Sequence, residues 1–477
     1  MVRLVSFGAA ALLAVWATVP SAAPAGAAPD TLSPASVVAA GGAPQLFAPA
    51  TEGQIVIYRG ATLIDGTGGP ARADMAVVTD GPIIREVVPS ARLTPATLQG
   101  ARIVELHGRY LLPGLIDSHQ HLATPPNRKA AEAEMRRGLY SGITAIRDMA
   151  DDVRSIAELA RAARVGEIEG PDIFYSVLVA GPSFFEDPRT RVASLGAKAG
   201  GVPWMQAITD DTDLRLAVAM ARGTSATGLK IYANLPPHLV KALAAEAHGQ
   251  GLRVWAHGMV FPTPPADVIA AAPDVISHTC YLAYQVSANR PQSYQDRFPV
   301  DYAQFKDGDN PVMAGLFREM KRQRIILDPT IRVYAQTDKQ AAKPGAKPYH
   351  CNLDLAARLT NQAWREGVEL STGTDGATEP KDPYPALHEE LVLLAERAGM
   401  PPAQVIRSAT LVGAMTIGEE ARMGTIAAGK LANFVVVEKN PLQDLRNLRS
   451  VMFTVKRGHR FDRGDYRPIG PGEIPAQ

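Results

Sequence analysis

Eight short apolar runs with strand character recur between residues 115 and 375, and helical periodicity lies between most of them. The runs cover residues 115–122, 143–149, 172–180, 228–232, 253–257, 275–280, 325–331 and 369–375. Strands that alternate with helices are typical of parallel sheets, and eight such units favour a closed barrel over an open sheet. We therefore predict an α/β fold with a (β/α)₈ TIM-like barrel over residues 113–415.

Segments rich in β-formers flank this region on both sides. They lie at 54–63, 75–78, 83–88 and 103–106 before it, and at 424–426, 433–437 and 451–456 after it. Short strands joined by turns suggest small antiparallel units. We predict that 53–112 and 416–465 pair to form one small β-sandwich domain built from both chain ends, with 466–477 as a tail.

Two long connections, 181–211 and 281–317, interrupt the predicted barrel. Each follows a strand, so each is expected at the carboxyl-terminal mouth, where barrel enzymes build their active sites. Long connections of this kind are commonly functional, and we expect these two to be lids that shape the substrate site.

The N-terminus has the pattern of a secretory signal peptide. Arg3 precedes an apolar stretch at 4–19, which is followed by Pro20 and by small residues at 21–27. We predict a signal peptide over 1–28 and a flexible lead-in over 29–52. An uncleaved membrane anchor is the alternative, although the apolar stretch is short for a membrane span. The expectation is an exported protein, periplasmic or secreted, with no stable membrane association after cleavage.

Composition restricts the partners. The chain has 49 Lys plus Arg and 48 Asp plus Glu, without long runs of either sign. This balance argues against nucleic acid or an anionic membrane as a main partner, because both favour concentrated basic charge. A small-molecule substrate is expected, and a homo-oligomer stays open.

Cys280 and Cys351 are the two cysteines. An exported protein could pair them, but the sequence does not show that they come close enough.

Polar residues mark the ends of five predicted strands. His119 and His121 end the first, and side chains two apart on a strand share a face, so both can reach one ion. The pair alone is a weak signal. At the ends of the fourth, fifth, sixth and eighth strands stand Lys230, His257, His278 and Asp375.

Each of these four residues also has an ordinary structural interpretation. Lys230 could pair with a neighbouring acid, His257 or His278 could be a hydrogen-bonded core histidine, and Asp375 could cap a helix. A single barrel rim would nevertheless gather all six side chains, and imidazole and carboxylate are ligands that Zn²⁺ accepts. Together they predict a metal site.

These motifs resemble the metal-dependent amidohydrolase superfamily, in its imidazolonepropionase-like branch with Xaa-Pro dipeptidase-type members. The resemblance covers about 54–461. It rests on Pro-Gly-Leu-Ile-Asp-x-His-x-His over 113–121 and on the motifs at 142–148, 228–232, 256–258, 276–278, 373–375 and 424–433. The last motif usually ends in Asp, and here ends in Asn433. This departure lies in the accessory domain and is not expected to affect the metal site.

The resemblance implies a site with two divalent metal ions, expected to be zinc. His119, His121 and Asp375 would hold one ion, and His257 and His278 the other. Lys230 would bridge both as a carbamate formed from CO₂.

It further implies that the metals generate a hydroxide from water, which attacks an amide carbonyl. Asp375 would act as general base and then as general acid. Tyr232 shares the facing of Lys230 and is expected to bind the substrate carboxylate or carbonyl, although a packing role is equally open.

The substrate expected first is a dipeptide or an N-acyl amino acid. A cyclic amidase is the alternative, followed by a deaminase, which Lys230 disfavours, and by a non-catalytic binding protein. Two other groups of polar residues are expected to have structural roles. Arg147 and Asp148 should form an ion pair, and His388 should lie at the surface or cap a helix.

Overall fold

A computed structural model describes residues 49–346, 349–376 and 378–474. The predicted signal peptide and most of the predicted lead-in lie outside the described residues. Within the described part of the chain, no helix is both long and apolar enough to cross a membrane.

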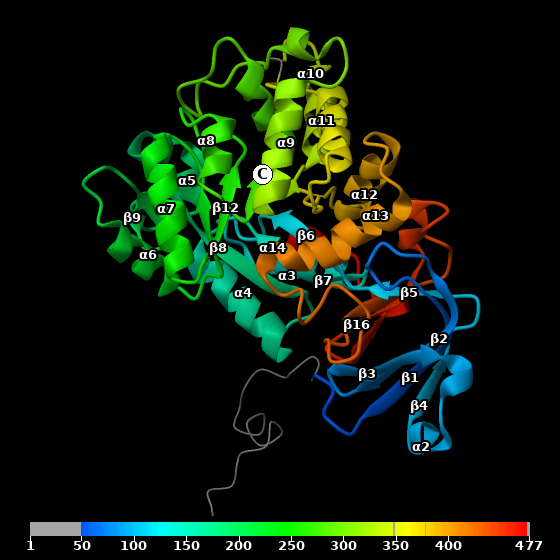
Figure 1. The fold of residues 1–477 in the computed structure, drawn as a ribbon. Helices are drawn as coiled ribbons and strands as arrows, with labels where there is room; N and C mark the ends of the chain where they lie inside the picture. Colours follow the sequence, from blue (N-terminus) through cyan, green and yellow to red (C-terminus); the bar gives the residue numbers. More distant parts are fainter. Residues whose placement is uncertain (1–48, 347–348, 377, 475–477) are drawn as a thin grey trace, which may run out of the picture. The chain divides into compact units, whose positions relative to one another are not determined.

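Parallel strands follow one another in sequence order around the barrel. They are β6 (Leu115–Gln120), β7 (Ile143–Asp148), β8 (Asp172–Ala180), β11 (Gly228–Ile231), β12 (Arg253–His257), β13 (Val275–Ser277) and β14 (Ile326–Asp328). Every one falls inside a predicted strand. Pairing is parallel at each step from β6 to β14. Figure 1 labels β6, β7, β8 and β12 among these strands.

The eighth strand is an irregular extended segment that closes the barrel. The Leu327 amide donates to Glu369 O at 2.9 Å, and the Ser371 amide donates to Leu327 O at 2.9 Å. On the opposite edge, the Ser118 amide of β6 donates to Thr372 O at 2.7 Å. The segment therefore joins the last strand to the first, which confirms the predicted TIM-like barrel.

Helices cover the outside of the barrel (Figure 1). Their bounds are α3 (Arg128–Leu139), α4 (Val153–Val165), α6 (Leu214–Arg222), α7 (Pro237–Gly249), α8 (Pro265–Ala270), α9 (Pro311–Gln323), α10 (Ile331–Ala341), α11 (Leu353–Arg365), α12 (Leu387–Glu396), α13 (Pro402–Arg407) and α14 (Gly413–Ile417).

Helix α4 shows how the sequence sets these boundaries. The Asp152 side chain accepts from the Arg154 amide at the start, and Gly166 ends the helix with a φ of 82°. A left-handed φ at this position suits glycine, which has no Cβ to clash. Val153, Ile156 and Leu159 are buried, so the spacing of three to four residues turns one face to the barrel.

Both long connections carry short elements of their own. The first contains η2 (Pro182–Glu186), α5 (Pro188–Val192), β9 (Gly201–Val202) and β10 (Met205–Ala207). The second contains η3 (Thr279–Val286) and η4 (Tyr302–Phe305). A disulfide joins Cys280 to Cys351, with 6.1 Å between the Cα atoms, so the two cysteines do pair.

The two chain ends build one eight-stranded sheet, as predicted. Its order is β17-β16-β15-β5-β1-β2-β3, with β4 also paired to β1. The strands are β1 (Ile55–Leu63), β2 (Arg72–Asp80), β3 (Ile83–Pro89), β4 (Arg102–Glu105), β5 (Tyr110–Pro113), β15 (Phe434–Val437), β16 (Val451–Lys456) and β17 (His459–Asp462). The short helix α2 (Pro95–Leu98) precedes β4.

The sheet differs from the prediction in two details. It is mixed rather than antiparallel, because β1 runs parallel to β4 and β5. The predicted strand at 424–426 is an irregular bend, and its Ile426 amide donates to Asp65 O. The rings of Tyr58 and Phe434 lie 4.9 Å apart although β5 separates their strands in the sheet order. The sheet therefore curls around its own apolar core.

A buried ion pair fixes this sheet to the barrel. Lys456 Nζ, at the end of β16, lies 3.0 Å from Asp172, which begins β8. Lys456 also donates to Gly170 O at 2.7 Å, and Arg457 lies 2.6 Å from the same carboxylate. Burial would raise the pKa of Asp172, but the charges of Lys456 and Arg457 outweigh burial and hold it below its usual value.

Asp172→Asn is expected to lower the free energy of unfolding by about 3–5 kcal/mol at neutral pH, because Lys456 keeps its charge in a buried place. A depressed carboxyl pKa stabilises the fold above the unfolded-state pKa, and this stabilisation is lost as pH falls through the folded-state pKa. The difference in free energy of unfolding between wild type and Asp172→Asn should therefore become smaller below about pH 4. Denaturant unfolding at several pH values measures it.

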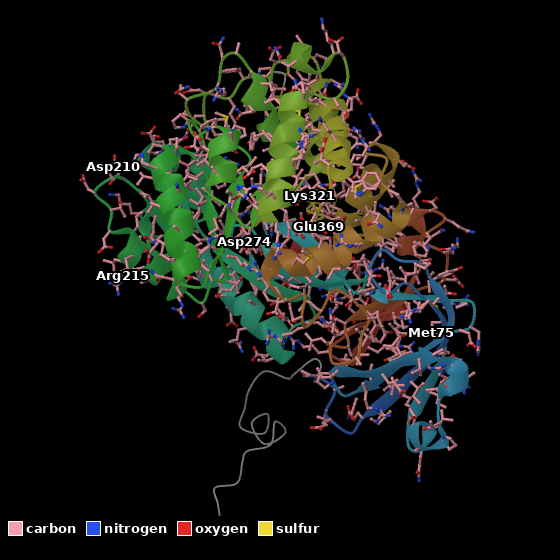
Figure 2. All side chains as sticks on the ribbon, in the orientation of Figure 1. Met75, Asp210, Arg215, Asp274, Lys321 and Glu369 are labelled. Atoms are coloured by element: carbon pink, nitrogen blue, oxygen red, sulfur yellow. A yellow bond between two sulfur atoms is a disulfide. The ribbon has the colours of Figure 1, made fainter. Side chains whose placement is uncertain are left out.

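Asp210→Asn is the matched control. Asp210 lies at the edge of the molecule (Figure 2), with its side chain 76% exposed beside His238. An exposed pair contributes at most about 1 kcal/mol, so this variant should unfold nearly like wild type. Equal losses in both variants would contradict the role assigned to Asp172.

Candidate metal centre

The carboxylate of Asp375 lies among three imidazoles at the carboxyl-terminal end of the barrel. Its Oδ1 is 3.4 Å from His119 Nε2 and 3.5 Å from His121 Nε2, and its Oδ2 is 3.7 Å from His278 Nδ1. Burial would raise the pKa of Asp375, but His119, His121 and His278 outweigh burial and hold it well below the usual value. The centre therefore contains an ionised carboxylate.

The backbone explains why these groups meet. Asp375 adopts a φ of 41° and His278 a φ of 70°. Left-handed backbone is uncommon for residues other than glycine, and such positions cluster at functional sites. The Asp375 amide donates to His119 O at 2.9 Å, so barrel closure itself brings the last predicted ligand to the first.

Two imidazole nitrogens of this centre, His119 Nε2 and His257 Nδ1, are buried and make no hydrogen bond to any described residue. An unsatisfied buried polar atom costs about 1–3 kcal/mol, and a bound cation would satisfy both nitrogens. The donor atoms of His119, His278 and Asp375 all lie within 4.8 Å of one another, and could hold one ion. The residues present therefore fit a metal site.

This group mixes residues that the sequence assigns to two different ions. His257 stands beside it, with its ring centre 4.9 Å from that of His278. His121 reaches Asp375 from the other side, and its Nδ1 is 3.1 Å from Asp151. Burial would lower the pKa of His121, but hydrogen bonds to Asp151 and Asp375 outweigh it and raise the pKa to about 10. The division of the ligands between two ions stays a prediction.

Lys230 is buried at the same end of the barrel. Its Nζ lies 4.8 Å from the centre of the Tyr232 ring, and donates to Met149 O at 3.4 Å. No carboxylate in the described residues forms an ion pair with it. Burial lowers the pKa of Lys230 to about 8, despite the attraction of Asp375. The expected alternative of a structural salt bridge is therefore not what the geometry shows.

A residue that the sequence analysis missed, Asp328, supports the centre from below. It ends β14, and its Oδ2 lies 2.9 Å from His119 Nδ1 and 2.9 Å from Arg147 Nη2. Ser277 donates to the same oxygen at 3.0 Å. A partner on the second ring nitrogen orients a ligating histidine. The available signal was the position of Asp328 at a strand end, which the six recognised residues share.

Two structural expectations were wrong. Arg147 pairs with Asp328 rather than with Asp148, because its side chain crosses the barrel interior, whereas Asp148 accepts from the Leu122 amide at 3.1 Å. His388 is buried instead of exposed, and its Nε2 lies 3.1 Å from Ser141 O.

A cavity of about 350 Å³ opens onto this centre, within the usual range for small-molecule sites. Both predicted lids line it, the first through Phe184 and Arg189 and the second through Tyr281 and Tyr294. A third wall was not predicted. It comes from α10 and the segment before α11, and contributes Tyr334, Tyr349 and His350. Tyr232 also lines the cavity, with its ring 4.2 Å from that of His257.

Comparison with known proteins gives the family. Residues 110–460 match the Amidohydrolase family. The chain belongs to this family. It is therefore a hydrolase, and the family name denotes hydrolysis of amide and related carbon–nitrogen bonds.

Relatives of this amidohydrolase have several activities. It is 26% identical to ochratoxinase from Aspergillus niger over 451 residues, which cover 84% of this chain and 85% of that protein. It is 25% identical over 389 residues to imidazolonepropionase from Pseudomonas aeruginosa, covering 76% of this chain and 87% of that one.

Solved structures share the fold. A Xaa-Pro dipeptidase with bound methionine superposes with a TM-score of 0.67 at 21% identity, covering 86% of this chain and all of that one. Ochratoxinase from A. niger gives 0.69 at 21% identity, with 88% of this chain and 98% of that one covered.

Asp328→Asn tests the support beneath the centre. The change leaves Arg147 buried without its counter-charge, so the free energy of unfolding should fall by about 3–5 kcal/mol. Loss of the partner of His119 should also weaken divalent-metal binding by roughly 10–100-fold. Denaturant unfolding and competition with a metal-binding dye measure the two effects.

Ser277→Ala is the control, since it removes one hydrogen bond to the same oxygen and no charge. It should cost about 1 kcal/mol and leave metal affinity close to wild type. Unchanged metal affinity in Asp328→Asn would show that Asp328 does not position a ligand.

Proposed function

We propose that this amidohydrolase cleaves the amide bond of a small substrate, a dipeptide or an N-acyl amino acid, with two divalent metal ions, zinc in the first instance. The observation that carries the proposal is the position of the Asp375 carboxylate, within 3.7 Å of nitrogens of three imidazoles that stand at two other strand ends. His119 Nε2 and His257 Nδ1, which are buried and make no hydrogen bond to any described residue, support it.

The proposed ligands are His119, His121, His257, His278, Asp375 and Lys230. When bound, the ions would lower the pKa of a water molecule and polarise the scissile carbonyl. Lys230 would contribute as a carbamate. Its pKa of about 8 leaves part of the population neutral, so that the Nζ lone pair can attack CO₂, form an N–C bond and release a proton.

Asp375 would move the proton in the reaction. Its carboxylate is ionised and faces the cavity, so it can accept a proton from the attacking water and return it to the departing nitrogen. Its Oδ1 lies 3.4 Å from His119 Nε2 and 3.5 Å from His121 Nε2, beside the proposed ligands. Tyr232, on the cavity wall beside His257, would bind the carbonyl or carboxylate of the substrate.

Similarity to Xaa-Pro dipeptidase and ochratoxinase favours amide substrates, and the cavity volume suits molecules of dipeptide size. We also propose that the protein is exported. The signal-like pattern before residue 29 supports this, as does the Cys280–Cys351 disulfide, since disulfides persist mainly in oxidising compartments.

A library of dipeptides and N-acyl amino acids, assayed with and without Zn²⁺, tests the proposal. Hydrolysis should disappear after chelation and return when metal is added. Asp375→Asn should lose nearly all turnover, by about 10²–10⁴-fold or more, because the proton acceptor is gone.

Circular dichroism and thermal unfolding establish that Asp375→Asn is folded, and Asp210→Asn serves as the matched exposed control. Turnover of an ester or lactone, with no activity on any amide, would overturn the substrate assignment. Wild-type turnover in Asp375→Asn would overturn the role of that residue.

A further inference from the structure

The turn between β14 and α10 lies against the end of β13, where His278 stands. The His278 amide donates to Asp328 O at 2.9 Å, and the Thr279 amide donates to Pro329 O at 3.4 Å. Thr330 comes next in this turn, and its φ of 49° is left-handed like the φ of 70° at His278. Strained backbone of this kind persists only where the surrounding contacts hold it. The structure thus holds two left-handed residues against each other at neighbouring strand ends.

The hydroxyl of Thr330 joins these two strand ends. It donates to Pro329 O at 2.8 Å, and its oxygen lies 2.9 Å from His278 Nδ1. A hydroxyl has one hydrogen to donate, so the second contact requires His278 Nδ1 to be the donor and Thr330 Oγ1 to be the acceptor. A neutral imidazole carries one N–H group, which leaves the lone pair on Nε2. This geometry therefore favours the tautomer of His278 in which Nε2 can bind a cation.

Thr330 also occupies the position that normally caps a helix. A threonine just before the first residue of a helix usually accepts hydrogen bonds from the first amides of that helix. Thr330 precedes Ile331, the first residue of α10, but its side chain makes no such bond. Glu390 of α12 makes these bonds instead. Its Oε1 accepts from the Ile331 amide at 3.1 Å, and its Oε2 accepts from the Arg332 amide at 2.7 Å.

Glu390 differs from the acid beside it on α12. The Glu390 side chain is fully buried, and no ion pair among the described residues includes it. Glu389 is 37% exposed, and its carboxylate lies 2.7 Å from Nε of the Arg332 side chain. Burying a carboxyl group is costly unless hydrogen bonds compensate for lost water. The two bonds to the backbone of α10 are therefore the contacts that justify the position of Glu390.

We propose that Thr330 is a positioning residue for His278, and that Glu390 frees the Thr330 hydroxyl for this role by capping α10 in its place. This inference rests on the proposed metal site, and adds to it two residues outside the proposed ligand set. A partner on the second ring nitrogen fixes the tautomer and the orientation of a ligating histidine. Without Glu390, the free amides of α10 would compete with His278 for the Thr330 oxygen.

Thr330→Val tests the role of the hydroxyl, because valine keeps the branched shape and removes the acceptor. In metal-free protein with isotope-labelled histidine, long-range proton–nitrogen NMR spectra should place the His278 hydrogen on Nδ1 in wild type. The variant should lose this single tautomer. Divalent-metal affinity, measured by competition with a metal-binding dye, should fall by roughly 10–100-fold. Thr330→Ser restores the hydroxyl, and should return both results close to wild type.

Thr360→Val is the matched control. Thr360 is also buried, and its hydroxyl donates to Ala356 O within α11 at 2.8 Å. This variant should keep the wild-type tautomer and metal affinity. A single Nδ1–H tautomer together with wild-type affinity in Thr330→Val would overturn the role of Thr330 alone. Absence of metal binding by wild type would overturn the proposed metal site, and this inference with it.

Glu390→Gln tests the link between the two residues, because a glutamine side chain can accept from only one of the two helix amides. Hydrogen exchange at the start of α10 should become roughly 10-fold faster, since one buried amide loses its acceptor. Metal affinity should also fall. In the Thr330→Val background, Glu390→Gln should lower metal affinity no further, because its effect passes through the Thr330 hydroxyl.

Glu389→Gln is the control for this second test. It removes an acid from the same helix and from the same neighbour, Arg332, but no bond to a helix amide. Metal affinity should stay close to wild type. If Glu390→Gln lowers metal affinity equally with and without the Thr330 hydroxyl, the link between Glu390 and His278 is wrong.

Discussion

Closure of the barrel is the constraint on which the rest of the structure depends. The eighth strand bonds to both β14 and β6, and its last hydrogen bond joins the Asp375 amide to His119 O. Parallel strands all end at one rim, so closure gathers polar side chains that are up to 256 residues apart in the chain. Without closure of the barrel, no imidazoles would lie beside the Asp375 carboxylate to offset the cost of burying its charge.

Beneath this rim, the barrel interior contains first a charged pair and then a cluster of apolar side chains. Asp328 and Arg147 form a buried pair under His119, and the guanidinium lies 4.9 Å from the Trp255 ring. Trp255 packs in one buried cluster with Ile116 and Phe174. A rigid apolar base and an ion pair thus fix the histidines from below, while the lids define the cavity above.

Much of this architecture could be predicted from the sequence, because buried parallel strands have continuous apolar sequences. The same runs located the strand-end residues His119, Lys230 and Asp375. The predictions that failed concern the direction in which side chains cross the barrel. Asp328 lies inside the predicted strand run 325–331, whose sequence does not show that its side chain reaches His119, and the partner of Arg147 lies 181 positions away. The bend at 424–426 has strand-like composition, but it pairs with none of the described strands.

The contacts of the two lids could not be predicted from the sequence either. Their length marked them as functional. The hydrogen bonds from Asn234 to Ser183 and Gln295, and the wall at Tyr349 and His350, depend on contacts between distant segments. The Cys280–Cys351 disulfide joins that third wall to the second lid. The sequence contained the cysteines but no information on the distance between them.

Crystals of the protein grown with Zn²⁺ and bicarbonate, with anomalous diffraction recorded on both sides of the zinc edge, test the central claim most directly. Two anomalous peaks should appear among His119, His121, His257, His278 and Asp375, with additional electron density on Lys230 Nζ between them. No zinc peak within bonding distance of these side chains would contradict the account.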